Sequence, residues 1–171
     1  MPLIELNASS RWHDKRDWKK ICEDSARAAF SVSSYNRLLT KDFVPEVSIK
    51  MSDSEEVQQL NKSYRGKDRP TNVLSFPLMD QSMLVTLLHN MDGEILLGDI
   101  ILAKTVCEEE AEEKQISLEN HVTHLIVHGT LHLLGYDHQE NAEALLMEEL
   151  EVKALQTLGI ANPYFEESVK R

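Results

Sequence analysis

Three histidines in the C-terminal third of this 171-residue chain have the residue type and spacing needed to bind a metal ion. His128 and His132 stand four residues apart, so a helix would present both imidazoles on one face, one turn apart. Gly135 can adopt the positive φ that ends a helix, which would let the chain turn and bring His138 back to the other two. Three neutral imidazoles that converge on one point, with room left for water, are a common way to hold a catalytic zinc ion.

The spacing of these histidines matches the long zinc-protease motif, His-Glu-x-x-His-x-x-Gly-x-x-His, except at one position. In that motif the residue after the first histidine is the glutamate that acts as general base. Here that residue is Gly129. The sequence therefore favours metal binding over proteolysis. A second interpretation is that His128 and His132 are buried, hydrogen-bonded core histidines of an apolar helix.

Other polar residues lie close to the three histidines in the sequence. His121 and His124 fall on the same predicted helix and could support the ligands or have no part in the site. Asp137 could orient His138, or it could simply stabilise the turn at the helix end. A fourth ligand from His124 or Asp137 would instead give the closed coordination that is typical of structural zinc.

Length and composition predict one soluble domain over residues 1–171, with a loose tail at 161–171. Hydrophobic residues make up 42% and charged residues 27%, which is ordinary for a globular protein. The N-terminus does not resemble a signal peptide, and no apolar run approaches the roughly 18 residues of a membrane span. Cys22 and Cys107 form no disulfide framework. Reduced thiols and a cytoplasmic location are therefore expected.

The net charge of −11 is distributed unevenly along the chain. Residues 1–70 hold 13 Lys/Arg and 11 Asp/Glu, whereas residues 71–171 hold 5 and 18. A surface that binds nucleic acid should therefore come from the first half. Two clusters of cations qualify, although ordinary solvated surface explains the first better: Arg11, Lys15, Arg16, Lys19 and Lys20, and then Lys62, Arg65, Lys67 and Arg69.

Hydrophobic periodicity predicts the α+β class, with a small mixed sheet and about five helices. The metal site would lie at the end of a helix in the C-terminal half. Residues 83–88 are apolar and fit either a strand or a helix. Ser52 is expected to cap the helix that ends at Gly66, and Asn141 the last helix. Strands are predicted at 3–6, 44–51, 73–77 and 94–102, and helices at 14–30, 52–65, 103–115, 117–134 and 141–159.

A second distinctive stretch covers residues 60–77, where a basic turn leads directly into an apolar strand. Arg65 near the start of such a turn could bind a phosphate in a bidentate manner. Together the two stretches resemble the YbeY family of bacterial endoribonucleases. The family signature H-G-x-L-H-L-x-G-Y-D-H is matched from His128 to His138. Its second block, N-x-x-Y-R-x-x-D-x-P-T-(D/N)-V-L-S-F-P, is matched from Asn61 to Pro77.

This resemblance implies a metal-dependent endoribonuclease with one Zn²⁺ on His128, His132 and His138. It places Arg65 where the family has an arginine that is important for activity. It also implies single-stranded RNA as substrate, a role at the 3′ end of the small-subunit ribosomal RNA, and ribosome quality control. Because the C-terminal half is acidic, independent RNA binding should be weak, and we expect a protein of the small subunit or an assembly factor to direct the enzyme. Two alternatives remain: a metal-dependent, peptidase-like hydrolase, and a non-catalytic ribosome-assembly factor with a structural metal.

Overall fold

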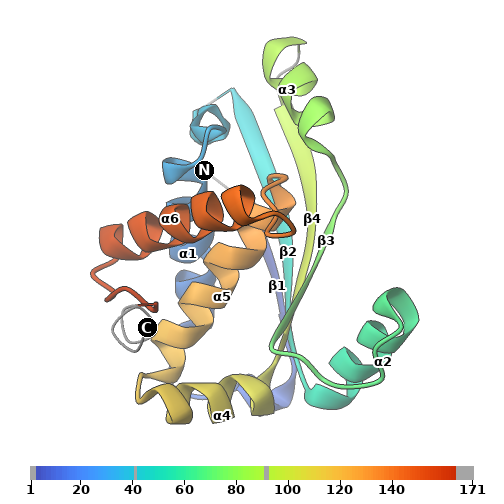
Figure 1. Cartoon of the computed structure of the whole chain (residues 1–171), viewed down its shortest axis with the longest axis vertical. Coiled ribbons are helices and arrows are strands. Elements are labelled where there is room, and N and C mark those ends of the chain that lie inside the picture. Colours follow the sequence, from blue (N-terminus) through green and yellow to red (C-terminus); the bar gives the residue numbers. More distant parts are fainter. Residues whose placement is uncertain (1–2, 41, 91–92, 165–171) are drawn as a thin grey trace.

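A four-stranded mixed sheet lies at the centre of the protein (Figure 1). The computed structural model describes residues 3–40, 42–90 and 93–164. The strands follow the order β1-β2-β4-β3; β1, β2 and β4 are parallel, and β3 is antiparallel to β4. The antiparallel strand therefore forms one edge of the sheet. The bounds are β1 Leu3–Ala8, β2 Phe43–Ser52, β3 Val73–Pro77 and β4 Gly93–Ala103.

Helices cover the two faces of the sheet unequally. Figure 1 shows α1, α5 and α6 on one side and α2 on the other. This arrangement confirms the α+β class. The described residues contain six α-helices rather than about five, because the ambiguous apolar segment at 83–88 is helical. The helices are α1 Trp18–Val32, α2 Ser54–Arg65, α3 Gln81–Asn90, α4 Lys104–Lys114, α5 Leu118–Leu133 and α6 Asn141–Thr157, with 3-10 turns at Ser10–Trp12 and Asn36–Leu39.

The main core lies between the sheet and the pair α1 and α5. Alternate side chains of β2 and β4, such as Ile49 and Ile100, are fully buried there. Gly129 of α5 rests against Ile100, since a Cβ at this position would lie only 3.1 Å from Ile100 Cδ1. The missing side chain thus lets α5 pack closely on β4. Small residues at a helix contact permit such a close approach. This packing sets the distance between the sheet and the α5 segment that carries His128 and His132.

Two predicted helix caps are displaced by one residue. Asp53 rather than Ser52 caps α2, because its side chain accepts a hydrogen bond from the Glu56 amide. The Ser52 hydroxyl instead donates to the Glu56 carboxylate. Asn141 is the first residue of α6, and Glu140 occupies the cap position without a capping side-chain bond. Both differences are within the usual uncertainty of helix ends read from sequence.

Both cysteines are free thiols that lie inside the protein. Burial raises the pKa of Cys22 and of Cys107 to about 12, so neither forms a reactive thiolate near neutral pH. None of the helices in the described part of the chain has the length and apolar character needed to cross a membrane.

Gly98 sets the spacing of β3 and β4, so Gly98→Ala is expected to lower the free energy of unfolding by about 3 kcal/mol. Its φ is +143°, and a Cβ there would lie 2.3 Å from the carbonyl oxygen of Phe76. Gly159→Ala is the matched control: its φ is +74° but nothing lies within 4 Å, so only about 1 kcal/mol should be lost. Urea unfolding followed by tryptophan fluorescence measures both. If both variants lost the same free energy of unfolding, the close approach of Gly98 to Phe76 would not contribute to stability.

Candidate metal centre

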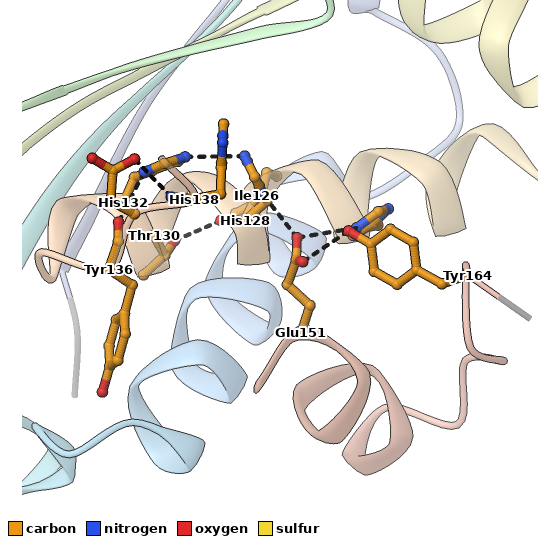
Figure 2. Close-up of polar contacts among 10 residues, drawn as sticks. Ile126, His128, Thr130, His132, Tyr136, His138, Glu151 and Tyr164 are labelled. Atoms are coloured by element: carbon orange, nitrogen blue, oxygen red, sulfur yellow. Dashed lines mark hydrogen bonds and ion pairs between the residues drawn. The ribbon is translucent and has the colours of Figure 1, made fainter. Parts of the chain in front are cut away.

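The side chains of His128, His132 and His138 converge at the C-terminal end of α5 (Figure 2). One ligand atom from each ring lies within 4.8 Å of the other two. The Nε2 atoms of His128 and His132 are 3.1 Å apart. The first two rings are half-buried, whereas His138 is exposed to solvent. The cluster therefore combines a protected interior side with an open outer side.

The turn after α5 brings the third histidine back toward the helix. Gly135 has a φ of +92°, as the sequence predicts, and its amide donates to the His132 carbonyl. Gln81 of α3 donates from its side chain to the Gly135 carbonyl at 3.1 Å. The Tyr136 hydroxyl accepts a hydrogen bond from the Ser34 amide just after α1. The turn is thus held by two elements distant in sequence, which positions His138.

Two of the three rings are oriented by acceptors at their Nδ1 atoms. Nδ1 of His128 lies 2.7 Å from the Glu151 carboxylate, and Nδ1 of His132 lies 2.9 Å from the Tyr136 carbonyl. A carbonyl or a carboxylate can only accept, so Nδ1 carries the proton in each ring. In the neutral form of each ring, Nε2 then presents a bare lone pair. Such an arrangement fixes both the tautomer and the ring orientation of a metal ligand.

The geometry of the two lone pairs fits a bound cation. Two unprotonated nitrogens that face each other at 3.1 Å repel unless a metal ion or a shared proton lies between them. Tetrahedral zinc with Zn–N bonds of about 2.0–2.1 Å would separate two ligand nitrogens by roughly 3.4 Å. The observed separation is therefore close to the value that a shared zinc ion requires. Among the described residues, no fourth histidine, cysteine or carboxylate joins this group.

The surroundings of His132 favour its neutral form. Burial lowers the pKa of His132, as do the charges of His128 and His138 when protonated, and the pKa falls to about 4. Neutral imidazole is the form that binds a metal. His132 is therefore ready to act as a ligand at physiological pH without first losing a proton.

A buried carboxylate on α6 contacts the histidine cluster through Nδ1 of His128. Glu151 is only 1% exposed, and its Oε1 is 2.7 Å from Nδ1 of His128 and 3.2 Å from Nε2 of His124. The Tyr164 hydroxyl donates to Oε2 of the same carboxylate at 2.8 Å (Figure 2). Burial alone would raise the pKa of Glu151, but the bonds from His124 and His128 outweigh it and lower the pKa to about 2. The carboxylate is therefore charged near neutral pH.

Tyr164 belongs to the predicted loose tail. Within the described residues this tail reaches only residue 164, and its tyrosine is hydrogen-bonded to the interior through Glu151. The tyrosine ring also meets the His124 ring edge-on, with centroids 5.6 Å apart. Residues 165–171 lie outside the described part of the chain.

The other polar residues near the motif have separate roles. Nε2 of the buried His121 lies 2.9 Å from Glu110, and His124 contacts Glu151. Neither histidine therefore joins His128, His132 and His138, the histidine triad. The Asp137 carboxylate accepts a hydrogen bond from the His138 amide at 2.7 Å. This contact is the turn-stabilising role that the sequence left open for Asp137.

The two cation clusters of the N-terminal half differ in their partners. In the first, Arg16 pairs with Asp14 and Glu119, and Lys20 pairs with Asp24, as expected of ordinary surface. In the second, Arg65 ends α2 and lines a cavity of about 320 Å³ together with Lys67 and Arg69. None of the three triad histidines lines this cavity. The structure thus places Arg65 in a separate basic site rather than among the histidines.

Glu151 is the functional candidate that motif analysis missed. One signal was present in the sequence, because Glu151 stands in the apolar stripe of α6 that contains Met147, Ala154 and Leu155. A lone carboxylate in such a stripe is rarely buried without a partner. Its partners, however, lie on α5, more than twenty residues away, so no local pattern identifies them.

The fold and the site together define an α+β protein with a cluster of three histidines whose ligand atoms are close enough to hold one metal ion. Comparison with known proteins gives the family. The model of the family described as "Endoribonuclease YbeY" matches residues 4–159. Curated relatives of that name include one from Sphingopyxis alaskensis, 49% identical over 96% of this chain and 98% of the relative. Another, from Zymomonas mobilis, is 51% identical over 96% and 93%. The chain belongs to the YbeY family.

A solved structure agrees with the fold. The solution structure of a protein from Thermotoga maritima aligns with 92% of this chain and 91% of its own, with a TM-score of 0.54. The identity is 23%, so this likeness bears on the fold alone.

We predict that Glu151→Gln weakens zinc binding by about 10- to 100-fold, because the substitution removes the charged acceptor that orients His128. Glu148→Gln makes the same change at an exposed position of α6 and should leave affinity unaltered. Competition with a chromophoric chelator gives the affinities. Ring ¹⁵N NMR reports whether His128 keeps its Nδ1 proton. Unchanged affinity and an unchanged tautomer in Glu151→Gln would rule out this positioning role.

Proposed function

We propose that the protein is a zinc-dependent endoribonuclease that cleaves single-stranded RNA during ribosomal RNA processing. The observation that carries the metal part is the approach of the Nε2 atoms of His128 and His132 to 3.1 Å, with His138 beside them. Family membership supports the RNA part, since the similar curated proteins are named endoribonucleases. Metal-assisted cleavage of RNA is the reaction that accounts for both the histidine cluster and the family membership.

The donor set supports zinc as the metal. Imidazole nitrogens suit zinc among the common divalent ions, and three protein ligands with one open position are typical of its catalytic sites. When bound, such an ion supplies a Lewis acid that stabilises charge on a phosphate oxygen and brings the pKa of water toward neutrality. The exposed side of His138 leaves the centre accessible to an RNA strand from solvent.

Residues of the protein itself orient the metal ligands and would hold the RNA. Glu151 and the Tyr136 carbonyl fix the rings of His128 and His132, so the ligand atoms need not reorganise when the reaction begins. Arg65 would bind a phosphate of the same RNA from its own cavity, as an anchor that keeps the strand in place. Gly129 provides no general base. The proton that an attacking water or RNA 2′-hydroxyl loses would therefore have to be accepted by solvent hydroxide or by another side chain.

The peptidase alternative is disfavoured by the position of Gly129. A Cβ at residue 129 would meet Ile100 at 3.1–3.3 Å, so a glutamate there would have to displace a fully buried side chain. The alternative of a purely structural metal is disfavoured by the donor count. His124 is engaged by Glu151 and Tyr164, and the described residues add no fourth donor to the triad.

The cellular setting follows from the same assignment. We place the protein in the cytoplasm, acting at the 3′ end of the small-subunit ribosomal RNA and in ribosome quality control. The chain carries a net charge of −11, so its own attraction to RNA should be weak. A protein of the small subunit, or an assembly factor, would then direct it to the substrate.

His132→Ala should abolish both stoichiometric zinc and cleavage of single-stranded RNA, because two remaining imidazoles hold the ion weakly. His13→Ala, an exposed histidine outside the site, should retain both. Atomic absorption and a gel assay on labelled RNA provide the two measurements, with a casein assay alongside. Equal RNA cleavage by metal-free and zinc-loaded wild-type protein would exclude the metal mechanism, and casein cleavage would favour the peptidase.

Arg65→Glu should lower kcat/KM for RNA by about 10- to 100-fold without removing zinc, since it replaces a charge-assisted contact with a repulsive one. Lys19→Glu makes the same charge change in the first cation cluster and should have little effect. Steady-state cleavage and metal content are measured on both variants. Loss of zinc from Arg65→Glu would mean that Arg65 supports the metal centre instead.

A further inference from the structure

The C-terminal turn of α2 separates two cavities of different chemistry. Tyr64 lines one cavity of about 690 Å³ on the face of the sheet opposite α5. Its neighbour Arg65 lines the second, of about 320 Å³. The side chains of consecutive helical residues point about 100° apart, so Tyr64 and Arg65 can line different cavities from the same turn of helix. Each cavity favours a different part of a nucleotide.

The larger cavity fits a nucleobase. The Tyr64 side chain is 70% exposed, and its ring stands 5.2 Å from the half-buried Phe76 ring. The walls carry hydrogen-bonding groups from three strands, namely Asn7, Ser48 and Asp99. A base offers a flat face for stacking and an edge with donors and acceptors, which these residues match. One cation, Lys50, also lines the cavity, but it pairs with Glu56. The carboxylates of Glu5 and Asp99 would therefore repel a phosphate here but can accept from a base amino group.

The smaller cavity fits a phosphate. Three cations, Arg65, Lys67 and Arg69, line it with one carboxylate, Glu110, whose Oε1 is already bonded to Asn72 and His121. None of the three cations has an ion pair within the part of the chain that the structure describes. Arg65 is the last residue of α2, and the loop that carries Lys67 and Arg69 is fixed, because the buried Asn61 side chain donates to the Arg69 carbonyl at 2.8 Å. Unpaired cations on a constrained loop bind phosphate with little loss of conformational freedom.

We propose that these two cavities form one nucleotide-binding subsite for single-stranded RNA: a base stacks on Tyr64 in the larger cavity, and an adjacent phosphate binds Arg65 and Lys67 in the smaller one. This inference rests on the proposed function and specifies how its substrate is held. Paired bases are already stacked in a duplex and cannot enter such a cavity. The subsite therefore selects unpaired RNA over duplex RNA.

The test uses a short 2′-O-methyl RNA that resists cleavage and carries one 2-aminopurine, whose fluorescence is quenched when it stacks. Affinity is measured by anisotropy at several salt concentrations for wild type, Tyr64→Ala and Tyr64→Phe. Leu145→Ala, an equally exposed apolar residue on α6, is the control. Cleavage of ordinary RNA is measured separately, and circular dichroism checks the fold of each variant.

Tyr64→Ala should weaken binding by about 5- to 150-fold and abolish quenching, whereas Tyr64→Phe and Leu145→Ala should behave as wild type. The slope of log affinity against log salt should be unchanged in Tyr64→Ala but smaller by about 0.7 in Arg65→Ala, because Arg65, unlike Tyr64, contacts a phosphate. If the wild type cleaves RNA but Tyr64→Ala binds and quenches normally, the base site is wrong and the proposed function stands. A wild type that neither cleaves nor binds RNA overturns both.

Discussion

The hydrogen bonds at the Nδ1 atoms of His128 and His132 are the interactions on which the rest of the site depends. Each bond places a proton on the far side of its ring and leaves Nε2 bare toward its neighbour. Without them either ring could rotate or change tautomer, and the lone pairs would avoid each other. Glu151 can serve as one acceptor because His124, His128 and Tyr164 offset the cost of burying its charge.

The fold supplies these acceptors by close packing. Gly129 allows α5 to rest on Ile100, which holds the helix that carries two of the histidines against the sheet. Helix α6 crosses behind it and presents Glu151, while the turn at Gly135 presents the Tyr136 carbonyl. The RNA-binding residues that we propose lie elsewhere, on α2 and the loop that follows it. The proposed metal centre and the proposed RNA-binding residues thus lie on different elements that share one sheet.

The features that the sequence predicts well are local ones. The triad follows from a four-residue helical spacing and a glycine turn, and β3 was placed at its observed bounds of 73–77. The helix at 81–90 was ambiguous because its apolar residues suit either period. Glu151 and the separation of Arg65 from the histidines depend on contacts between distant segments, which periodicity does not encode. The cap of α2 differs because the neighbouring Ser52 and Asp53 are equally suited to the position, whereas the cap position of α6 falls one residue early at Glu140, which makes no capping side-chain bond.

Zinc K-edge X-ray absorption on the protein as purified tests the central claim most directly, since it reports the ligands of the ion itself. The account predicts one zinc per chain with three imidazole nitrogens at about 2.0–2.1 Å and one further light-atom ligand from solvent. A sulfur ligand, four protein ligands or the absence of zinc from the folded protein would contradict it.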